Sequence, residues 1–183
     1  LAGSEYFSEA KIPAITITSS NPLVTSSSDY YFRTCFVDSF QGIALAKYAV
    51  EQAGTSKAAI FRDSDDDYAA AVSQTFTDKM LQLTGDENAI AKVIEYSHAQ
   101  KDFKIQLQQV QDSGAGVVLL ASKTKDAIEI MKQAKDMGLS LQFLGTDIWE
   151  SEAFVKEGGT AVEGAVFSSY FDPGTAITEN TKV

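Results

Sequence analysis

The chain has 183 residues, of which 44% are hydrophobic and 22% charged, which is typical of a folded protein of one domain or slightly more and argues against disorder. Its 25 acidic and 15 basic residues give a formal net charge of -10, and with only Arg33 and Arg62 as arginines this argues against a nucleic-acid partner. The single cysteine permits no internal disulfide, and no apolar run is long enough to span a membrane.

The expected elements begin with a helical segment at residues 1–7 and β-rich runs at 12–18 and 30–36. Asp38 is expected to cap a helix, and strands and helices alternate after it. Apolar runs predict strands at 57–62, 89–96, 116–121, 143–145 and 165–171. Glycines are expected to end the helices between them, at Gly54, Gly85, Gly114 and near Gly138, and Ser151 is expected to cap a further short helix.

This alternation predicts right-handed crossovers between parallel strands. The fold class is therefore α/β, with three layers in the order helix, parallel sheet, helix, as in a Rossmann-like lobe. In such a fold, ligands bind beyond the carboxyl ends of the strands.

Asp147 and Trp149 follow the expected strand at 143–145 and are candidates for a binding site. A carboxylate covered by an indole suits a cationic group such as an ammonium, through charge-assisted hydrogen bonds and cation–π contact. The alternative is structural: Asp147 caps the next helix and Trp149 packs beneath it. Position alone does not separate the two interpretations.

Ser19 and Ser20 follow the first β-rich run and precede Asn21-Pro22. Hydroxyl groups at this place either form a turn or donate hydrogen bonds to an anion such as a carboxylate. Taken alone, the composition favours the turn.

Motifs for metal binding and catalysis are incomplete. Asp63, Asp65 and Asp67 begin like a calcium loop, but Tyr68 and Gln74 occupy the positions that require glycine and glutamate. We therefore expect no metal. Asp63, Asp65 and Lys123 are compatible with a receiver-type phosphoacceptor domain, yet no aspartate ends the central strand at 89–96.

Nucleotide and nucleophile chemistry have no better support. Gly114-Ala115-Gly116 precedes a strand, whereas a nucleotide-binding glycine turn follows one. His98 in a polar loop and Cys35 in an apolar run belong to no catalytic motif, and their surface and structural interpretations are favoured. We expect no catalytic residues, no cofactor and no enzymatic activity.

Several short motifs occur in one order along nearly the whole chain. They are IPAIT at 12–16, SSNP at 19–22, YFRT at 31–34, DSFQGIALA at 38–46, DYA at 67–69, KDF at 101–103, KQAKDMG at 132–138, FLGTD at 143–147 and VEGA at 162–165. No single motif is specific, but the ordered set is a strong signal, and it resembles the branched-chain amino-acid-binding family of type I periplasmic binding proteins.

The resemblance implies a solute receptor whose two lobes close on an amino acid or related small polar molecule. It implies that Ser19 and Ser20 grip the ligand carboxylate, that Asp147 holds the ammonium and that Tyr68 covers the ligand. Relatives often carry an aromatic residue near Ser122 and Lys123. The lysine here favours an acidic or strongly polar ligand side chain instead.

The resemblance also implies a division of the chain. Residues 1–37 correspond to a remnant of the first lobe and a hinge crossover, 38–171 to the second lobe, and 172–183 to the start of a return crossover. Both ends resemble interrupted segments, so we expect a fragment of a longer, two-lobed protein whose opening strands precede Leu1.

The implied location is periplasmic or extracellular, with lipid anchoring through a segment before Leu1 left open. The implied partners are an amino-acid-like ligand and the membrane permease of an ABC importer. Two alternatives stay open: a ligand-sensing domain of a signalling or transcriptional regulator with the same fold, and the receiver-type phosphoacceptor.

Overall fold

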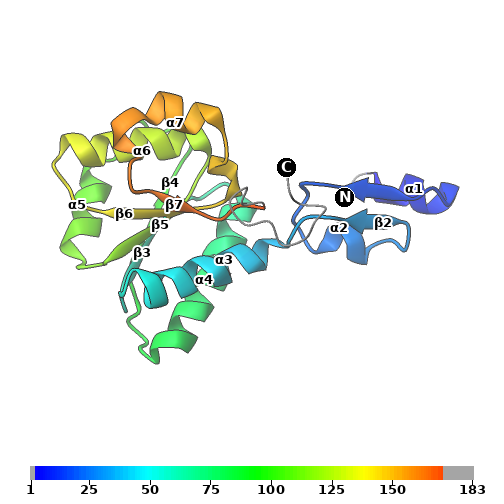
Figure 1. Ribbon diagram of the computed structural model, residues 1–183, viewed down its shortest axis with the longest axis horizontal. Coiled ribbons are helices and arrows are strands. Elements are labelled where there is room, and N and C mark those ends of the chain that lie inside the picture. Colours follow the sequence, from blue (N-terminus) through cyan, green and yellow to red (C-terminus); the bar gives the residue numbers. More distant parts are fainter. Residues whose placement is uncertain (1–2, 171–183) are drawn as a thin grey trace, which may run out of the picture.

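The computed structural model describes residues 3–170, and its main part is a sheet of five parallel strands (Figure 1). The strands are β3 (Ala58–Asp63), β4 (Ile90–Tyr96), β5 (Val117–Ala121), β6 (Gln142–Gly145) and β7 (Val166–Phe167). Their spatial order is β4-β3-β5-β6-β7. The chain thus moves from β3 outward to β4 and then crosses back to β5 on the other side. This reversal is the switch point at which open α/β sheets place their ligand crevice.

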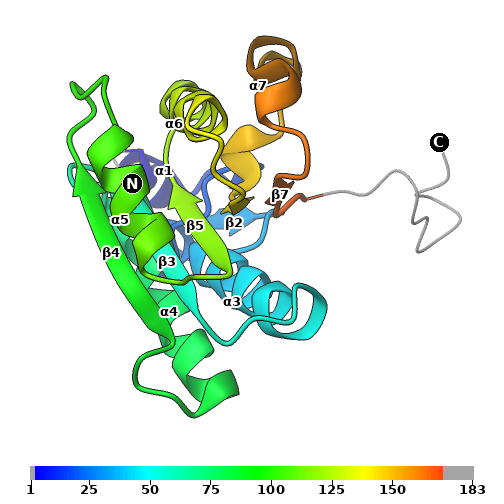
Figure 2. The ribbon, with the colours of Figure 1, turned by 90° about the vertical axis from the view of Figure 1, so that its left-hand side faces the viewer.

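Helices cover both faces of the sheet (Figures 1 and 2). The helices on one face are α3 (Asp38–Lys47), its continuation η1 (Tyr48–Gln52) and α4 (Asp67–Thr84). Those on the other face are α5 (Lys104–Asp112), α6 (Thr124–Asp136) and α7 (Glu152–Gly158), with the short 3₁₀ turns η2 (Asp147–Trp149) and η3 (Gly159–Ala161). The predicted three-layer α/β fold is confirmed.

Alternation along the strands divides the interior into two hydrophobic cores. In β3, Phe61 points into the core beneath α5, α6 and α7, and its neighbour Ile60 points into the core beneath α3 and α4. All five residues of β5 are buried, as expected of a central parallel strand with helices on both faces.

The first part of the chain lies beside this lobe in Figure 1. It contains α1 (Ser4–Ala10), β1 (Ala14–Thr16), α2 (Leu23–Ser26) and β2 (Tyr31–Arg33), and the two strands form a separate parallel pair. Arg33 reinforces it by donating hydrogen bonds to the Asn21 carbonyl at 2.7 Å and to Thr25 Oγ1 at 2.8 Å. Both strands are shorter than the predicted runs.

Two local predictions need correction. Val37, not Asp38, holds the N-cap position of α3, and Asp38 is the first residue of the helix. The same helix does not continue regularly to Ala53, because its last turn widens into the π-helical η1, where Ala53 N donates to the Tyr48 carbonyl. Ser151 does cap α7 as predicted, accepting a hydrogen bond from Phe154 N.

The predicted division at 37/38 and 171/172 stays a prediction, and residues 1–2 and 171–183, including the last residue of the strand expected at 165–171, lie outside the described part. No helix within residues 3–170 combines the length and the apolar character that a membrane crossing requires.

Candidate functional site

A cavity of about 340 Å³ lies where the first part of the chain meets the start of α3 and α4. It brings together three of the predicted site residues, Ser19, Ser20 and Tyr68, although Tyr68 is about fifty positions from the serines. Ser19 is exposed and Ser20 is half-buried. The complete lining is Thr18, Ser19, Ser20, Asn21, Val24, Asp38, Asp67, Tyr68 and Ala71.

Asp147 does not line this cavity, but it is hydrogen-bonded to Tyr68, which does. The Tyr68 hydroxyl donates to Asp147 Oδ1 at 2.7 Å. Tyr68 is fixed in the first turn of α4 because its backbone N–H donates to the N-cap residue Asp66 at 2.9 Å. Burial raises the pKa of Tyr68, and the neighbouring Asp147 raises it further. The phenol therefore stays protonated and donates its hydrogen bond at neutral pH.

Gln41 on α3 joins these residues, and it is fully buried. Its Nε2 donates to the Tyr68 hydroxyl at 2.8 Å, while its Oε1 accepts from Asp147 N at 3.1 Å and from Ser168 Oγ at 2.6 Å. One side chain thus connects α3, α4 and the segments that follow β6 and β7. The sequence analysis missed Gln41 as a site residue. The available signal was an amide on the buried stripe of a helix, one turn after Asp38.

Asp38 and Asp67 are the two carboxylates that line the cavity, and Asp38 Oδ1 is buried without a hydrogen-bond partner. Burial raises the pKa of Asp38, and the charge of Asp147 adds to the rise, whereas hydrogen bonding from Ser20 and the charge of Arg33 oppose it. Asp38 and Asp147 therefore both contribute negative charge near the cavity. As a site residue Asp38 was not predicted.

Tyr170 approaches Asp147 from the end of the described chain. Burial raises the pKa of Tyr170, and a hydrogen bond to Asp147 raises it further. The ring stacks on Phe36, with centroids 4.1 Å apart. The Asp147 carboxylate therefore accepts a hydrogen bond from Tyr68 on α4, and the Tyr170 phenol from beyond β7 lies near it.

The prediction for Trp149 is wrong. Its indole lies in the core beneath α6 and α7, is 1% exposed and stacks on Phe154 with centroids 4.9 Å apart. Gly145 makes room for it, since a Cβ there would lie 2.2 Å from the indole ring. Trp149 therefore cannot cover a ligand, and the alternative interpretation that it packs beneath the turn is the correct one.

Ser122 and Lys123 lie at the end of β5, next to the strand that leads to Asp147. The Ser122 side chain is buried, and its carbonyl accepts from Trp149 Nε1 at 3.4 Å. Lys123 is exposed at the N-cap position of α6. Neither residue lines the cavity that contains Ser19, Ser20 and Tyr68.

The arrangement provides two neighbouring carboxylates, two serine hydroxyls and two tyrosine hydroxyls. Within residues 3–170, neither Asp38 nor Asp147 forms an ion pair with a basic side chain. Such a region attracts a cationic group, and the serine hydroxyls can donate to an anionic one. Chemically, the site suits binding of a molecule that carries both charges.

Comparisons with known proteins identify the family. A family model described as periplasmic binding protein matches residues 1–182. An amino acid binding protein of Pseudomonas aeruginosa is 28% identical over 98% of this chain and 49% of its own length. The Leu/Ile/Val-binding protein homolog 2 of Brucella abortus is 28% identical over 93% of this chain and 45% of its own length.

Solved structures give the same result for the fold. The leucine binding protein LivK from Thermotoga maritima superposes with a TM-score of 0.83 at 28% identity, over 96% of this chain and 49% of that protein. The branched-chain amino acid transporter substrate binding protein LivJ from Streptococcus pneumoniae, solved with isoleucine, superposes with a TM-score of 0.84 at 22% identity, over 97% and 50%. The chain therefore spans about half the length of the relatives that it matches.

Proposed function

The chain belongs to the periplasmic binding protein family, and from this membership we propose that it is part of an extracytoplasmic solute receptor of an ABC importer. The ligand is an amino acid or a related small zwitterion, held between two lobes. Relatives named for amino acids, and for leucine, isoleucine and valine in particular, support this ligand class. None of the relatives reported above is a regulatory sensor or a phosphoacceptor domain.

The observation that carries the proposal is the environment of Asp147. Its carboxylate is half-buried, is oriented by Tyr68 and forms no ion pair within residues 3–170. A carboxylate in this environment favours a bound cation, because a partly desolvated charge is costly when no opposite charge lies beside it. An ammonium group supplies both the opposite charge and the hydrogen-bond donors.

Ser19 and Ser20 supply the complementary part of the site in this proposal. They line the cavity that Tyr68 also lines, so donors for a ligand carboxylate lie within one small region of the acid that holds the ammonium. Tyr68 connects the two parts, because its hydroxyl is bonded to Asp147 while its side chain lines the cavity.

Lys123 is the residue that we connect with side-chain preference. It is exposed at the start of α6, and Thr124 Oγ1 beside it donates to the Ile148 carbonyl at 2.9 Å, which holds the start of α6 against the segment containing Asp147. An ammonium at this place favours an acidic or polar ligand side chain over an aliphatic one. Ser122 is too deeply buried to share this role, and we assign it no ligand contact.

The proposed location and partners follow from the family: a periplasmic or extracellular receptor that delivers its ligand to a membrane permease. Lipid anchoring stays a separate hypothesis.

The test uses the natural protein that contains this chain. Native mass spectrometry would identify a co-purified ligand, and thermal unfolding would be followed with a panel of amino acids. The matched comparison is each stabilising amino acid against the 2-hydroxy acid with the same side chain, which lacks the ammonium. We expect stabilisation by the amino acid and none by the hydroxy acid at equal concentration. An equal effect of both compounds, or no effect of any amino acid, would contradict the proposal.

A further inference from the structure

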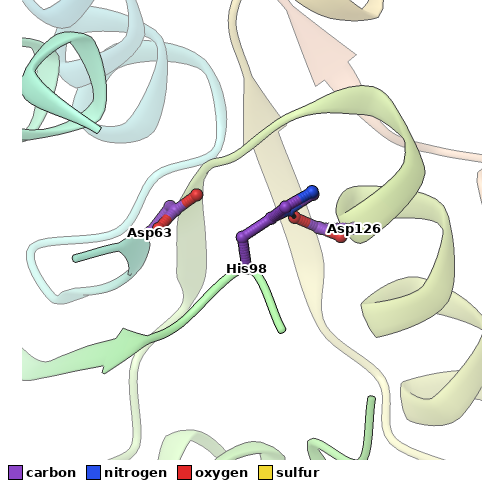
Figure 3. A group of neighbouring side chains, drawn as sticks. All are labelled: Asp63, His98 and Asp126. Carbon is purple, nitrogen blue, oxygen red and sulfur yellow. Dashed lines mark hydrogen bonds and ion pairs between the residues drawn. The ribbon is translucent and has the colours of Figure 1, made fainter. Parts of the chain in front are cut away.

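A second group of polar side chains shares no residue with the candidate ligand site. Asp63, His98 and Asp126 each place one ligand atom within 4.8 Å of the others, although they are far apart in the sequence (Figure 3). His98 Nδ1 lies 2.5 Å from Asp126 Oδ2. The three residues come from the end of β3, the loop after β4 and the first turn of α6.

The fold explains why these residues converge. β3 is the neighbour of both β4 and β5, and the carboxyl ends of β3 and β5 flank the switch point of the sheet. Asp63 follows Phe61 by two positions and therefore faces the core beneath α5 and α6, the side on which Asp126 lies. Gln41 and Tyr68, the partners of Asp147, come from helices on the opposite face. The two groups therefore have different residues and different supporting helices.

Burial makes the charges of this group unusual. Asp63 is 2% exposed and Asp126 is 3% exposed, so two carboxylates lie close together with little access to water. Asp63 Oδ1 accepts a hydrogen bond from Asp65 N at 3.0 Å, and Asp126 Oδ2 is hydrogen-bonded to His98 Nδ1. With His98 protonated, one negative charge remains uncompensated. With His98 neutral, two remain, which is the charge of one divalent cation.

Two buried hydroxyl groups beside these carboxylates give an independent indication. Tyr96 is paired with Asp63 in the sheet register and is 2% exposed, yet its hydroxyl completes no hydrogen bond. The Ser122 hydroxyl is also buried without a completed hydrogen bond, and it lies next to the Tyr96 hydroxyl. Buried polar groups of this kind are normally satisfied by protein, water or an ion.

From these observations we propose that Asp63, His98 and Asp126 form a binding site for a divalent transition-metal ion of the Zn²⁺ type, with Tyr96 beside the open coordination position. One imidazole and two carboxylates are a ligand set that Zn²⁺ accepts, and the two negative charges balance the ion. The calcium-loop motif tested in the sequence does not bear on this site, since only Asp63 belongs to that motif. The proposal does not depend on the proposed transport function.

The geometry requires only small movements. Zinc ligands lie about 2.0–2.2 Å from the ion, so donor atoms around it are roughly 3.4 Å apart. The His98–Asp126 contact would open slightly, and the longest separation would close. The His98 side chain can make this adjustment because 54% of its surface is exposed, whereas the Asp126 side chain is buried. The bound ion would tie the ends of β3 and β4 to the start of α6.

The experiment titrates the metal-stripped full chain with Zn²⁺ against a chromophoric chelator and records the visible spectrum with Co²⁺ as a replacement ion. We expect one ion per chain at micromolar or lower concentration. His98→Gln and Asp126→Asn should each weaken Zn²⁺ binding by more than about tenfold, since losing a partner outside the ligand set already costs about 10–100-fold. Both variants should also change the Co²⁺ spectrum.

Two control variants remove a charge without removing a ligand. Asp65→Asn alters the same acidic loop, and Asp136→Asn alters the far end of α6; both side chains are exposed, so binding should stay within about twofold of the parent. If Asp126→Asn fails to fold, as judged by circular dichroism, His98→Gln still decides, because His98 lies in an exposed loop. A simple His98–Asp126 ion pair predicts no Zn²⁺ affinity. Absence of binding to the parent, or unchanged binding in His98→Gln, would overturn the proposal.

Discussion

The Tyr68 hydroxyl donates a hydrogen bond of 2.7 Å to Asp147, a residue 79 positions further along the chain. This bond fixes the start of α4 against the turn that follows β6. A carboxylate can accept about four hydrogen bonds, so the bond from Tyr68 leaves acceptor positions free on Asp147. The bond therefore orients the Asp147 carboxylate and leaves it able to accept hydrogen bonds from a ligand.

Replacing Asp147 tests its role directly. We expect Asp147→Ala, in the natural protein that contains this chain, to weaken amino-acid binding by about 2–5 kcal/mol, the cost of removing one partner of a buried charge pair. The matched control is Glu150→Ala, which removes an exposed acid three residues away and should leave affinity unchanged. Calorimetry measures both. A loss of less than about threefold for Asp147→Ala would contradict the assignment.

Removing only the Tyr68 hydroxyl separates orientation from charge. Tyr68→Phe keeps the ring but leaves Gln41 Nε2 and Asp147 Oδ1 without this partner. We expect the free energy of unfolding to fall by about 1–3 kcal/mol, the cost of unsatisfied buried groups. Ligand affinity should fall too, but less than in Asp147→Ala, because the carboxylate is retained.

The matched control for Tyr68 is Tyr48→Phe. It removes a hydroxyl that accepts from Gln142 Nε2 at 3.2 Å, away from the cavity. That variant should change stability only. Urea denaturation and calorimetry on both variants distinguish the two effects, and equal loss of affinity in both would argue against a specific role for Tyr68.

The layers of this fold were predictable because they depend on local periodicity. The apolar run at 116–121 and the helix around Ile130 and Met131 show their burial in the sequence itself. The order of the strands was not predictable in this way, because a crossover to either side of β3 is compatible with the same pattern. The widened last turn of α3 likewise has no local signal that we can identify.

The site was predictable only where a residue type alone carries the chemistry. Asp147 and the serine pair could be proposed because an acid and hydroxyls at strand ends suit a ligand, although a cap and a turn explained them equally well or better until the family resemblance was considered. Gln41 could not, since its partners lie 27, 106 and 127 positions away. Trp149 was misplaced because the space under its indole is created by Gly145, and a glycine after a strand equally indicates the start of a loop.

Gly42 lies where α3 packs against α4, and replacing it with alanine should destabilise the protein, although alanine usually stabilises a helix relative to glycine. Alanine normally stabilises a helix interior relative to glycine by about 0.5–1 kcal/mol. At Gly42 a Cβ would lie 2.1 Å from Thr75 Oγ1 and 2.7 Å from Phe76 N. We therefore expect Gly42→Ala to lower the free energy of unfolding by about 1–3 kcal/mol, the scale of overpacking.

A second variant identifies the atoms responsible at Gly42. Adding Thr75→Ala removes the hydroxyl contact but not the contact with the backbone of α4, so only part of the loss should be recovered. Urea denaturation measures the series. Greater stability of Gly42→Ala than of the parent would show that the helices separate freely at this crossing.

Asp38 predicts a pH dependence whose sign is unusual for a carboxyl group. Burial raises its pKa in the folded protein above the ordinary value of 3.8, so the folded state binds the proton more tightly than the unfolded state. The free energy of unfolding should therefore fall as the pH rises from 3.8 through the raised pKa.

The variant Asp38→Asn tests this prediction, because its side chain cannot become charged and should not lose stability in this way. We expect the variant and the parent to have similar stability below the window and the variant to be more stable above it, with the difference reaching a plateau. Urea denaturation between about pH 3 and pH 8 measures that difference, in a range that contains the ordinary carboxyl pKa and neutral pH. A difference that does not change with pH would show that Ser20 and Arg33 offset the penalty of burial, and a parent that gains stability relative to the variant as the pH rises would show that they exceed it.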